Sequence, residues 1–293
     1  AIVERVSITV SATSVLRRNA VKREFERFMS KRGVIIANTG TPDVPEADVV
    51  RAYLAEFLQD PRICPLPAPL WKIILHAFIL PKRAHASAEK YRQIWTSQGS
   101  PLQSGMASLA HKLQASFNEQ DKATLVRHGM SYGSPSIKQA LGELKAEGCD
   151  ELVILSLYPQ NALSTTGVVA DKTLAALSAL DWHPQTKLVG YYSAHLLYLE
   201  AIAASIRAAG FDSSAGDKLL FAFHSIPVRD IRNGDDYEDK ARATANAVAR
   251  LLELDVQDWA LGFQCRFDKA RSWLGPFIPE ALQTLGAPRG RLF

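Results

Sequence analysis

The chain has 293 residues, of which 47% are hydrophobic, and a formal net charge of +4. Residues 1–32 carry eight Lys and Arg against three Glu, so the remainder is almost neutral, which argues against a nucleic-acid-binding surface on the folded part. Three scattered cysteines without a CxxC pair argue against a disulfide framework or a cysteine-held cluster, and no apolar run reaches the ~18 residues of a membrane span.

The basic N-terminal extension, residues 1–32, is expected to lie outside the fold. It has no continuous apolar core of the kind that signal peptides carry, and its acidic residues are unlike an organelle transit peptide. Met29 stands directly ahead of the first apolar run, which suggests an upstream extension of 28 residues. An amphipathic targeting helix is the alternative interpretation.

Six short apolar runs without alternation predict strands of parallel sheets that are covered on both faces. They are residues 33–38, 124–128, 151–157, 187–192, 218–223 and 259–264. Helical stripes fill the gaps, and one of them, Ile137 to Leu144, is expected to have Ser134 as its cap and Pro135 as its first position. Strands that alternate with helices predict an α/β fold with right-handed crossovers.

The segment Leu70–Pro81 is apolar but too short for a membrane span, and Lys72 and His76 interrupt it. Two interpretations remain open for it. It is either a buried helix or an amphipathic lip that touches a membrane surface or an oily substrate.

A weak internal repeat divides the chain. The stretches 33–42 (GVIIANTGTP) and 218–227 (KLLFAFHSIP) have the same length, alanine at the fifth place and proline at the tenth. The repeat predicts a first domain at 33–192 and a second at 193–293. Because the first half continues with two more strand units, the second domain is expected to be incomplete, with an exposed edge.

Ligands of open parallel sheets bind beyond the carboxyl ends of the strands, so the residues at those ends are the candidates for a site. They are rich in hydroxyls, amides and aromatics, and GxGxxG, GxxxxGK[ST], GxSxG and HExxH are all absent, which argues against a nucleotide enzyme or a common hydrolase. His224 ends one predicted strand, where a catalytic role and a structural role are equally well supported. His128 ends another and is a secondary candidate.

Six ordered motifs resemble those of the ferrochelatase family, in particular its bacterial members. They are ANTGTPDVPEADVVRAYLAEFLQDPR, YRQIWTSQGSPL, GMSYGSPSIKQAL, LYPQNALSTTG, FHSIPVRDIRNGDDY and FQCRFDKARSWLGP, which together cover about Gly33 to Gly286. The resemblance implies two similar Rossmann-like, chelatase-type domains around a porphyrin cleft. It also implies insertion of Fe²⁺ into protoporphyrin IX, the terminal step of heme synthesis, with release of two protons.

The resemblance further implies roles for individual residues. His224 matches the family's essential histidine, which would accept a proton or hold the arriving metal. The expected porphyrin-binding residues are Thr39, Ser131, Tyr132, Tyr158, Gln160, Ser164, Thr165, Gln264, Arg266 and Trp273. Trp273 could instead belong to the core, and Arg266 could be either a propionate clamp or an ion-pair partner. Asn161 stands where the family usually has an aromatic residue.

The family's acidic GF…DxLETL segment is expected to follow Phe293 and is absent from the sequence given. The main alternative is therefore a catalytically inactive porphyrin- or metal-binding relative, and a chelatase for another tetrapyrrole, such as sirohydrochlorin, is a weaker one. Fe²⁺ and the porphyrin are the expected partners, with no organic cofactor, no iron–sulfur cluster and no nucleic acid. We expect a cytoplasmic protein with peripheral contact to the inner membrane through residues 70–80. Protoporphyrin is favoured over coproporphyrin, and the oligomeric state is left open.

Overall fold

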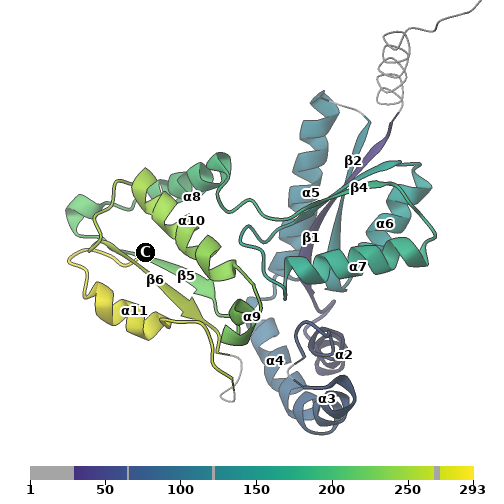
Figure 1. Cartoon of the computed structure of the whole chain (residues 1–293), viewed down its shortest axis with the longest axis horizontal. Coiled ribbons are helices and arrows are strands. Elements are labelled where there is room, and N and C mark those ends of the chain that lie inside the picture. Colours follow the sequence, from purple (N-terminus) through teal and green to yellow (C-terminus); the bar gives the residue numbers. More distant parts are fainter. Residues whose placement is uncertain (1–29, 65, 121–122, 267–270) are drawn as a thin grey trace, which may run out of the picture.

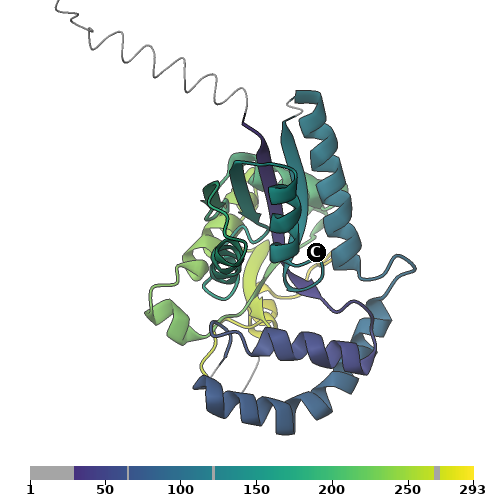
Figure 2. The same ribbon diagram turned by 90° about the vertical axis from the view of Figure 1, so that its right-hand side faces the viewer.

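The computed structural model describes residues 30–64, 66–120, 123–266 and 271–293. Its strands and helices alternate along most of the chain, and the strands form two separate sheets in which all pairings between strands are parallel. The predicted α/β fold is confirmed. Figures 1 and 2 show the two sheets side by side, with a set of helices crossing below them.

The first sheet has the strand order β2-β1-β3-β4. Its strands are β1 (Arg32–Thr41), β2 (Thr124–Gly133), β3 (Glu151–Ser156) and β4 (Gln185–Val189). The central strand β1 carries the run Ile35, Ile36 and Ala37, whose side chains are completely buried. β-branched residues favour such a strand because they pack well on a pleated surface with neighbours on both sides.

Helices cover both faces of this sheet (Figure 1). On one face, α6 (Ile137–Ala146) and α7 (Thr166–Ala179) pack on Ile35 and Ile154, whereas α5 (Pro101–Gln120) packs on Ile36 and Val126 on the other. Ser136 rather than Ser134 caps α6, because its hydroxyl accepts from the backbone N–H of Gln139 and the Gln139 side chain returns the bond. The predicted cap was therefore two residues too early.

The second sheet consists of β5 (Leu219–His224) and β6 (Trp259–Gln264), which pair with Leu219 opposite Trp259 and His224 opposite Gln264. Helices α8 (Leu196–Ala208) and α10 (Tyr237–Leu251) cover one face, and α11 (Ile278–Leu285) packs against Gly262 on the other. A short 3₁₀ turn, Ser213–Ala215, precedes β5, and α9 (Val228–Arg232) follows it.

Among the described residues, the backbone partners on the outer edge of β5 lie where the strand begins. The N–H groups of Lys218 and Leu220 donate to the carbonyls of Arg291 and Phe293, and Phe293 N–H returns a bond to Lys218. Leu292 forms a parallel bridge with Lys218. Farther along β5, Ala222 is exposed, so the sheet has the exposed strand edge that the sequence predicted.

Between β1 and β2 the chain makes a helical excursion that lies beneath both sheets (Figure 2). It comprises α2 (Ala47–Leu58), α3 (Ala68–Ile74), a π-helical turn (Leu75–Ile79) and α4 (Leu80–Ile94). Trp71, Leu75 and Leu80 are buried in it, whereas Leu70, Ile73 and Phe78 are between 51% and 67% exposed. The segment is therefore buried on one face and exposes apolar side chains on another. We call the exposed apolar face the lip surface, and its residues are Leu66, Leu70, Ile73 and Phe78.

Several strand boundaries differ from the prediction, and β1, for example, continues to Thr41 instead of ending at residue 38. β2 continues to Gly133, so His128 lies in the middle of a strand opposite Ile36 and not at its tip. β4 ends at Val189, three residues before the predicted end. Ser30 and Lys31 already contact Asp150, so the ordered fold begins before Gly33, and residues 1–29 lie outside the described part. Within the described ranges, no helix combines the length and the apolar character that crossing a membrane requires.

Candidate active site

His224 is the last residue of β5, and its side chain is exposed. Its ring nitrogen Nδ1 lies 2.6 Å from the carbonyl oxygen of Ser225. A carbonyl can only accept, so Nδ1 must carry the hydrogen of this bond. The neutral ring therefore has its lone pair on Nε2, which is the atom that can accept a proton or bind a metal ion.

The carbonyl that orients this ring is itself held in place. Ser225 is 1% exposed; its N–H donates to the carbonyl of Gln264 at 2.8 Å, and its hydroxyl donates to the carbonyl of Leu274, also at 2.8 Å. The backbone of Ser225 is thus bound to the end of β6, and its side chain is bound to the segment that follows β6. The imidazole orientation is set by backbone atoms rather than by another mobile side chain.

The backbone of His224 has a second support. Its backbone hydrogen-bonds the phenol group of Tyr237, the first residue of α10, and burial is the largest influence raising the pKa of Tyr237 to about 12. Asp235 accepts from the N–H of Tyr237 at 3.0 Å, and its other oxygen accepts from the N–H of Leu163 at 2.8 Å. Both Asp235 and Tyr237 are under 9% exposed. The sequence prediction identified the GDDY stretch only as part of a family motif. An aspartate just before a helical stripe is also a helix-start signal, and that signal predicts the start of α10 here.

On the first sheet, Thr39 lies near the carboxyl end of β1, next to Tyr158, which follows the end of β3. Burial raises the pKa of the Tyr158 phenol well above its usual range, and the nearby backbone of Thr39 opposes this shift. The phenol oxygen is buried without a hydrogen-bond partner among the described residues, and the N–H of Thr39 donates to Asn38 Oδ1 at 2.8 Å. Gly40 follows with a φ of 110°, and a Cβ there would lie 1.8 Å from the carbonyl oxygen of Tyr132. Only glycine lets β1 and β2 approach so closely at this position.

Ser131 and Tyr132 have a different environment from the one that the sequence suggested. Tyr132 is 2% exposed, its ring packs edge-to-face on Phe57 at 5.1 Å, and Lys172 Nζ lies 4.9 Å from the ring centroid. Burial, with Asp60 close to the hydroxyl, raises the pKa of Tyr132 far above its usual range. Ser131 is 5% exposed. Both side chains are therefore buried, and that of Tyr132 packs against α2.

The loop 158–165 joins the two halves. Gln160 is 8% exposed and its amide contacts α8 and α10, whereas Thr165 turns back on its own loop by bonding the backbone of Ala162. Ser164 is half-buried. Asn161 Oδ1 is a buried oxygen without a hydrogen-bond partner among the described residues. Four of the predicted residues, Tyr158 included, thus lie in this loop, but their contacts differ.

The remaining predicted residues lie at the end of β6 and in the residues that follow it. Gln264 is exposed and lies opposite His224 on β6, and exposed Arg266 places its guanidinium 4.5 Å from the ring centroid of Phe277. Trp273 forms an antiparallel bridge with Pro227, three residues after His224, and Arg271 stacks on its ring at 4.8 Å. The half-buried Trp273 is therefore not a core residue, and it stands beside the histidine loop.

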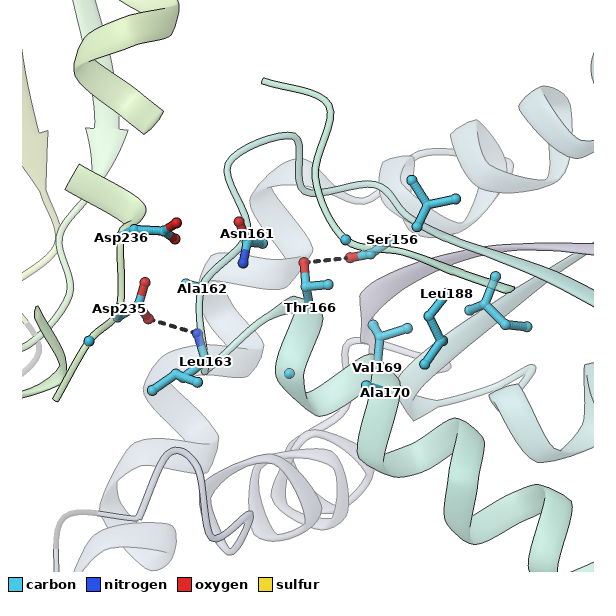
Figure 3. Close-up of a pocket in the computed structure, with 15 residues that line it drawn as sticks. Ser156, Asn161, Ala162, Leu163, Thr166, Val169, Ala170, Leu188, Asp235 and Asp236 are labelled. Carbon is cyan, nitrogen blue, oxygen red and sulfur yellow. Dashed lines mark hydrogen bonds between the residues drawn. The ribbon is translucent and has the colours of Figure 1, made fainter. Parts of the chain in front are cut away.

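A cavity of ≈ 270 Å³ opens on the other side of the loop (Figure 3). It lies between the ends of β3 and β4, the start of α7 and the Asp235–Asp236 turn, and Ser156, Asn161, Leu163 and Thr166 are among its lining residues. Figure 3 shows the bond from Asp235 to Leu163 and the 3.2 Å contact between the Ser156 and Thr166 hydroxyls at its wall. His224, Thr39 and Trp273 do not line this cavity.

The arrangement is poor in carboxylates and has one well-oriented imidazole. Within the described residues, no three His, Cys, Asp or Glu side chains gather to hold a metal ion. What the site offers is a neutral base at Nε2, a tryptophan wall and an exposed guanidinium. These groups suit proton removal from a planar, anionic aromatic ligand better than hydrolysis or group transfer.

The fold and this strand-tip site define an α/β protein with a histidine-centred active site built on parallel strands. The Ferrochelatase family model matches residues 31–290, and the chain belongs to the ferrochelatase family, whose members are metal-chelatase enzymes of the lyase class. A ferrochelatase from Nitrosococcus oceani is 40% identical over 255 residues, which is 87% of this chain and 69% of that relative.

Proposed function

We propose that this protein inserts ferrous iron into protoporphyrin IX to form heme. The ferrochelatase family supports the reaction class, and the observation that carries the proposal is the His224 ring, with Nδ1 bonded to a fixed carbonyl and Nε2 free to react. Fe²⁺ replaces two pyrrole N–H protons, so the site must take up protons one at a time or hold the metal as they leave. A neutral imidazole is suited to both tasks at neutral pH.

The other residues serve binding in this proposal. Trp273 and the Thr39–Tyr158 pair would form walls for the macrocycle, and walls of this kind can bend a planar porphyrin and expose its nitrogen lone pairs. Arg266 would face a propionate carboxylate, since its guanidinium lies on the apolar ring of Phe277, is exposed, and makes no ion pair with another described residue. Gln264, opposite His224, would contact the same substrate.

Metal insertion can be followed directly by absorbance. Anaerobic protein is mixed with protoporphyrin IX and Fe²⁺ or Zn²⁺, and we expect the porphyrin spectrum to convert to that of the metalloporphyrin with multiple turnovers. Binding of porphyrin without turnover would overturn the proposal in favour of an inactive, binding-only relative. Conversion of sirohydrochlorin but not protoporphyrin would replace the substrate.

We also propose that the lip surface binds to a membrane surface. Leu70, Ile73 and Phe78 are exposed together on α3 and the π-helical turn, and Lys72 and Lys82 flank them, as expected of an interfacial helix. Sedimentation with vesicles that contain one-third anionic lipid should capture the protein, and Ile73→Ser with Phe78→Ser should release it. Leu174→Ser is the matched control, because Leu174 is 58% exposed on α7. Equal binding by all variants would rule out this surface.

A further inference from the structure

Gln160 is a buried glutamine at the junction of the two halves, and its contacts are all with the second half. Its side chain is 8% exposed; Nε2 donates to Thr244 Oγ1 on α10 at 3.0 Å and to the Tyr198 hydroxyl on α8 at 3.2 Å. We propose that Gln160 is a positioning residue that locks the loop 158–165 onto α8 and α10, and so fixes the first half of the site relative to His224. This inference rests on the proposed function.

The partners of Gln160 are fixed by their own contacts. Thr244 is 2% exposed, and its hydroxyl lies 2.9 Å from the carbonyl of Lys240 and 3.2 Å from that of Ser193. With one hydrogen to give to a carbonyl, the hydroxyl keeps its lone pairs for the Gln160 amide. Ser193 belongs to the connection between β4 and α8 and is 3% exposed, so the same hydroxyl also anchors the segment that links the two halves.

A second set of contacts closes a ring around this junction. Tyr198 stacks edge-to-face on Tyr192 with the ring centroids 5.4 Å apart, and the N–H of Tyr192 donates to the carbonyl of Pro159 at 3.2 Å. Pro159 is the neighbour of Gln160, so the loop is held by backbone and side chain at once. Burial raises the pKa of Tyr192 to about 12 and also raises that of Tyr198. Both hydroxyls are protonated at neutral pH, as tyrosines of ordinary pKa also are.

The loop has a second attachment to the same helix. Leu163 N–H donates to Asp235 at the start of α10, whereas Gln160 reaches Thr244 two turns farther along. Two attachments on one helix prevent the loop from rotating as well as from sliding. Because Tyr158 at the start of this loop lies beside Thr39, and Tyr237 at the start of α10 holds the backbone of His224, the lock connects both sides of the site.

This role differs from the direct porphyrin contact that the sequence suggested for Gln160, and two conservative variants separate them. Thr244→Val and Tyr198→Phe remove only a hydroxyl and leave the Gln160 side chain present. Thr284→Val is the control for the first, because the Thr284 hydroxyl bonds the carbonyl of Glu280 one turn back on α11, as Thr244 does with Lys240. Tyr191→Phe is the control for the second, since Tyr191 is 57% exposed.

We expect Thr244→Val and Tyr198→Phe each to raise the KM for porphyrin roughly 3- to 10-fold, the loss of one hydrogen bond, with a smaller change in kcat. Hydrogen–deuterium exchange in residues 158–165 and 190–195 should accelerate in the same variants and in neither control. An increase in KM for Gln160→Leu alone, with the hydroxyl variants unchanged, would show direct substrate contact and overturn the lock. Wild-type protein that inserts no metal would refute the proposed function, while the exchange measurement would still decide on the lock.

Discussion

The first strand of each sheet, β1 and β5, has a similar sequence but different surroundings. β1 has a full-length partner on each side, and Ile35, Ile36 and Ala37 are completely buried. β5 has one full-length partner, and at the position that the internal repeat aligns with Ala37 it carries the exposed Ala222. The first sheet is therefore a buried frame. The second brings its strand tip, and with it His224, to the surface.

This difference suggests a division of labour between the halves: the second half carries the catalytic side chain, and the first half serves as a rigid frame. A residue that must bind and release protons and metal needs access to solvent, which the tip of β5 has and the buried centre of β1 does not. The aligned tip of β1 carries Thr39, which has no titratable group in the physiological range. Four comparisons between residues of the molecule test this interpretation.

The largest expected effect is on activity at the two strand tips. His224→Ala should lower kcat for metal insertion by roughly 10²- to 10⁴-fold, because it removes the only oriented base that the site shows. Thr39→Ala at the aligned position should stay within roughly 10-fold of wild type, since it trims a wall. Both variants should bind porphyrin as judged by fluorescence quenching. Equal losses at the two tips would contradict the division of labour.

The second comparison tests the stability of the two strands. Ile35→Ala leaves a cavity at a side chain that is completely buried and should cost about 2–5 kcal/mol of unfolding free energy. Leu220→Ala, at the aligned position of β5, should cost about half as much or less, because Leu220 is only half-buried. Urea denaturation with an unchanged m-value would measure both. A larger cost at Leu220 would show that the second sheet is the more tightly packed one.

How far the sequence predicted these features depends on the range of the interaction. All six strands were predicted within a few residues, because an apolar run between turn signals is a local property. The exposure of the strand-tip His224 also followed from topology. The burial of Tyr132 did not, because it depends on Phe57 and Lys172 from two other elements. The contacts of Gln160, which span 38 and 84 residues of sequence, could not be predicted from any local pattern.

The third comparison concerns the partly paired edge of β5. Asp217, 2% exposed, accepts from the N–H and guanidinium of Arg291 and from the N–H of Asp212, and these donors hold its pKa below the usual range. A carboxyl whose pKa is lower in the folded state stabilises above the unfolded pKa of about 3.9, and this stabilisation is lost as the pH falls through the folded value.

Asp217→Asn should therefore destabilise the protein equally from pH 7 to pH 5, and the difference from wild type should shrink below a pH of about 4. Hydrogen–deuterium exchange at Lys218 and Leu220 should accelerate, because their N–H groups donate to the segment that Arg291 anchors. Asp255→Asn, an exposed aspartate after α10, is the control. A difference that persisted below a pH of about 2 would show that Asp217 acts through packing and not through its charge.

The smallest effect is expected at the ion pair that ties the helical excursion to the first half. Arg62 binds Asp171 on α7 through two bonds of 2.5 and 3.0 Å, and this contact lowers the pKa of Asp171 below its usual range. Asp171 is 56% exposed, however, so solvent screens the pair, and Asp171→Asn should cost only about 0.2–1 kcal/mol of unfolding free energy.

The dependence on salt distinguishes the Arg62–Asp171 pair from the Arg291–Asp217 pair. Raising the ionic strength to about 1 M should abolish the effect of Asp171→Asn and leave most of the effect of Asp217→Asn, because a buried carboxylate is screened far less. If salt removed both effects equally, the Asp217–Arg291 contact would be no less screened than the exposed pair, and the expectation for the edge of β5 would be wrong.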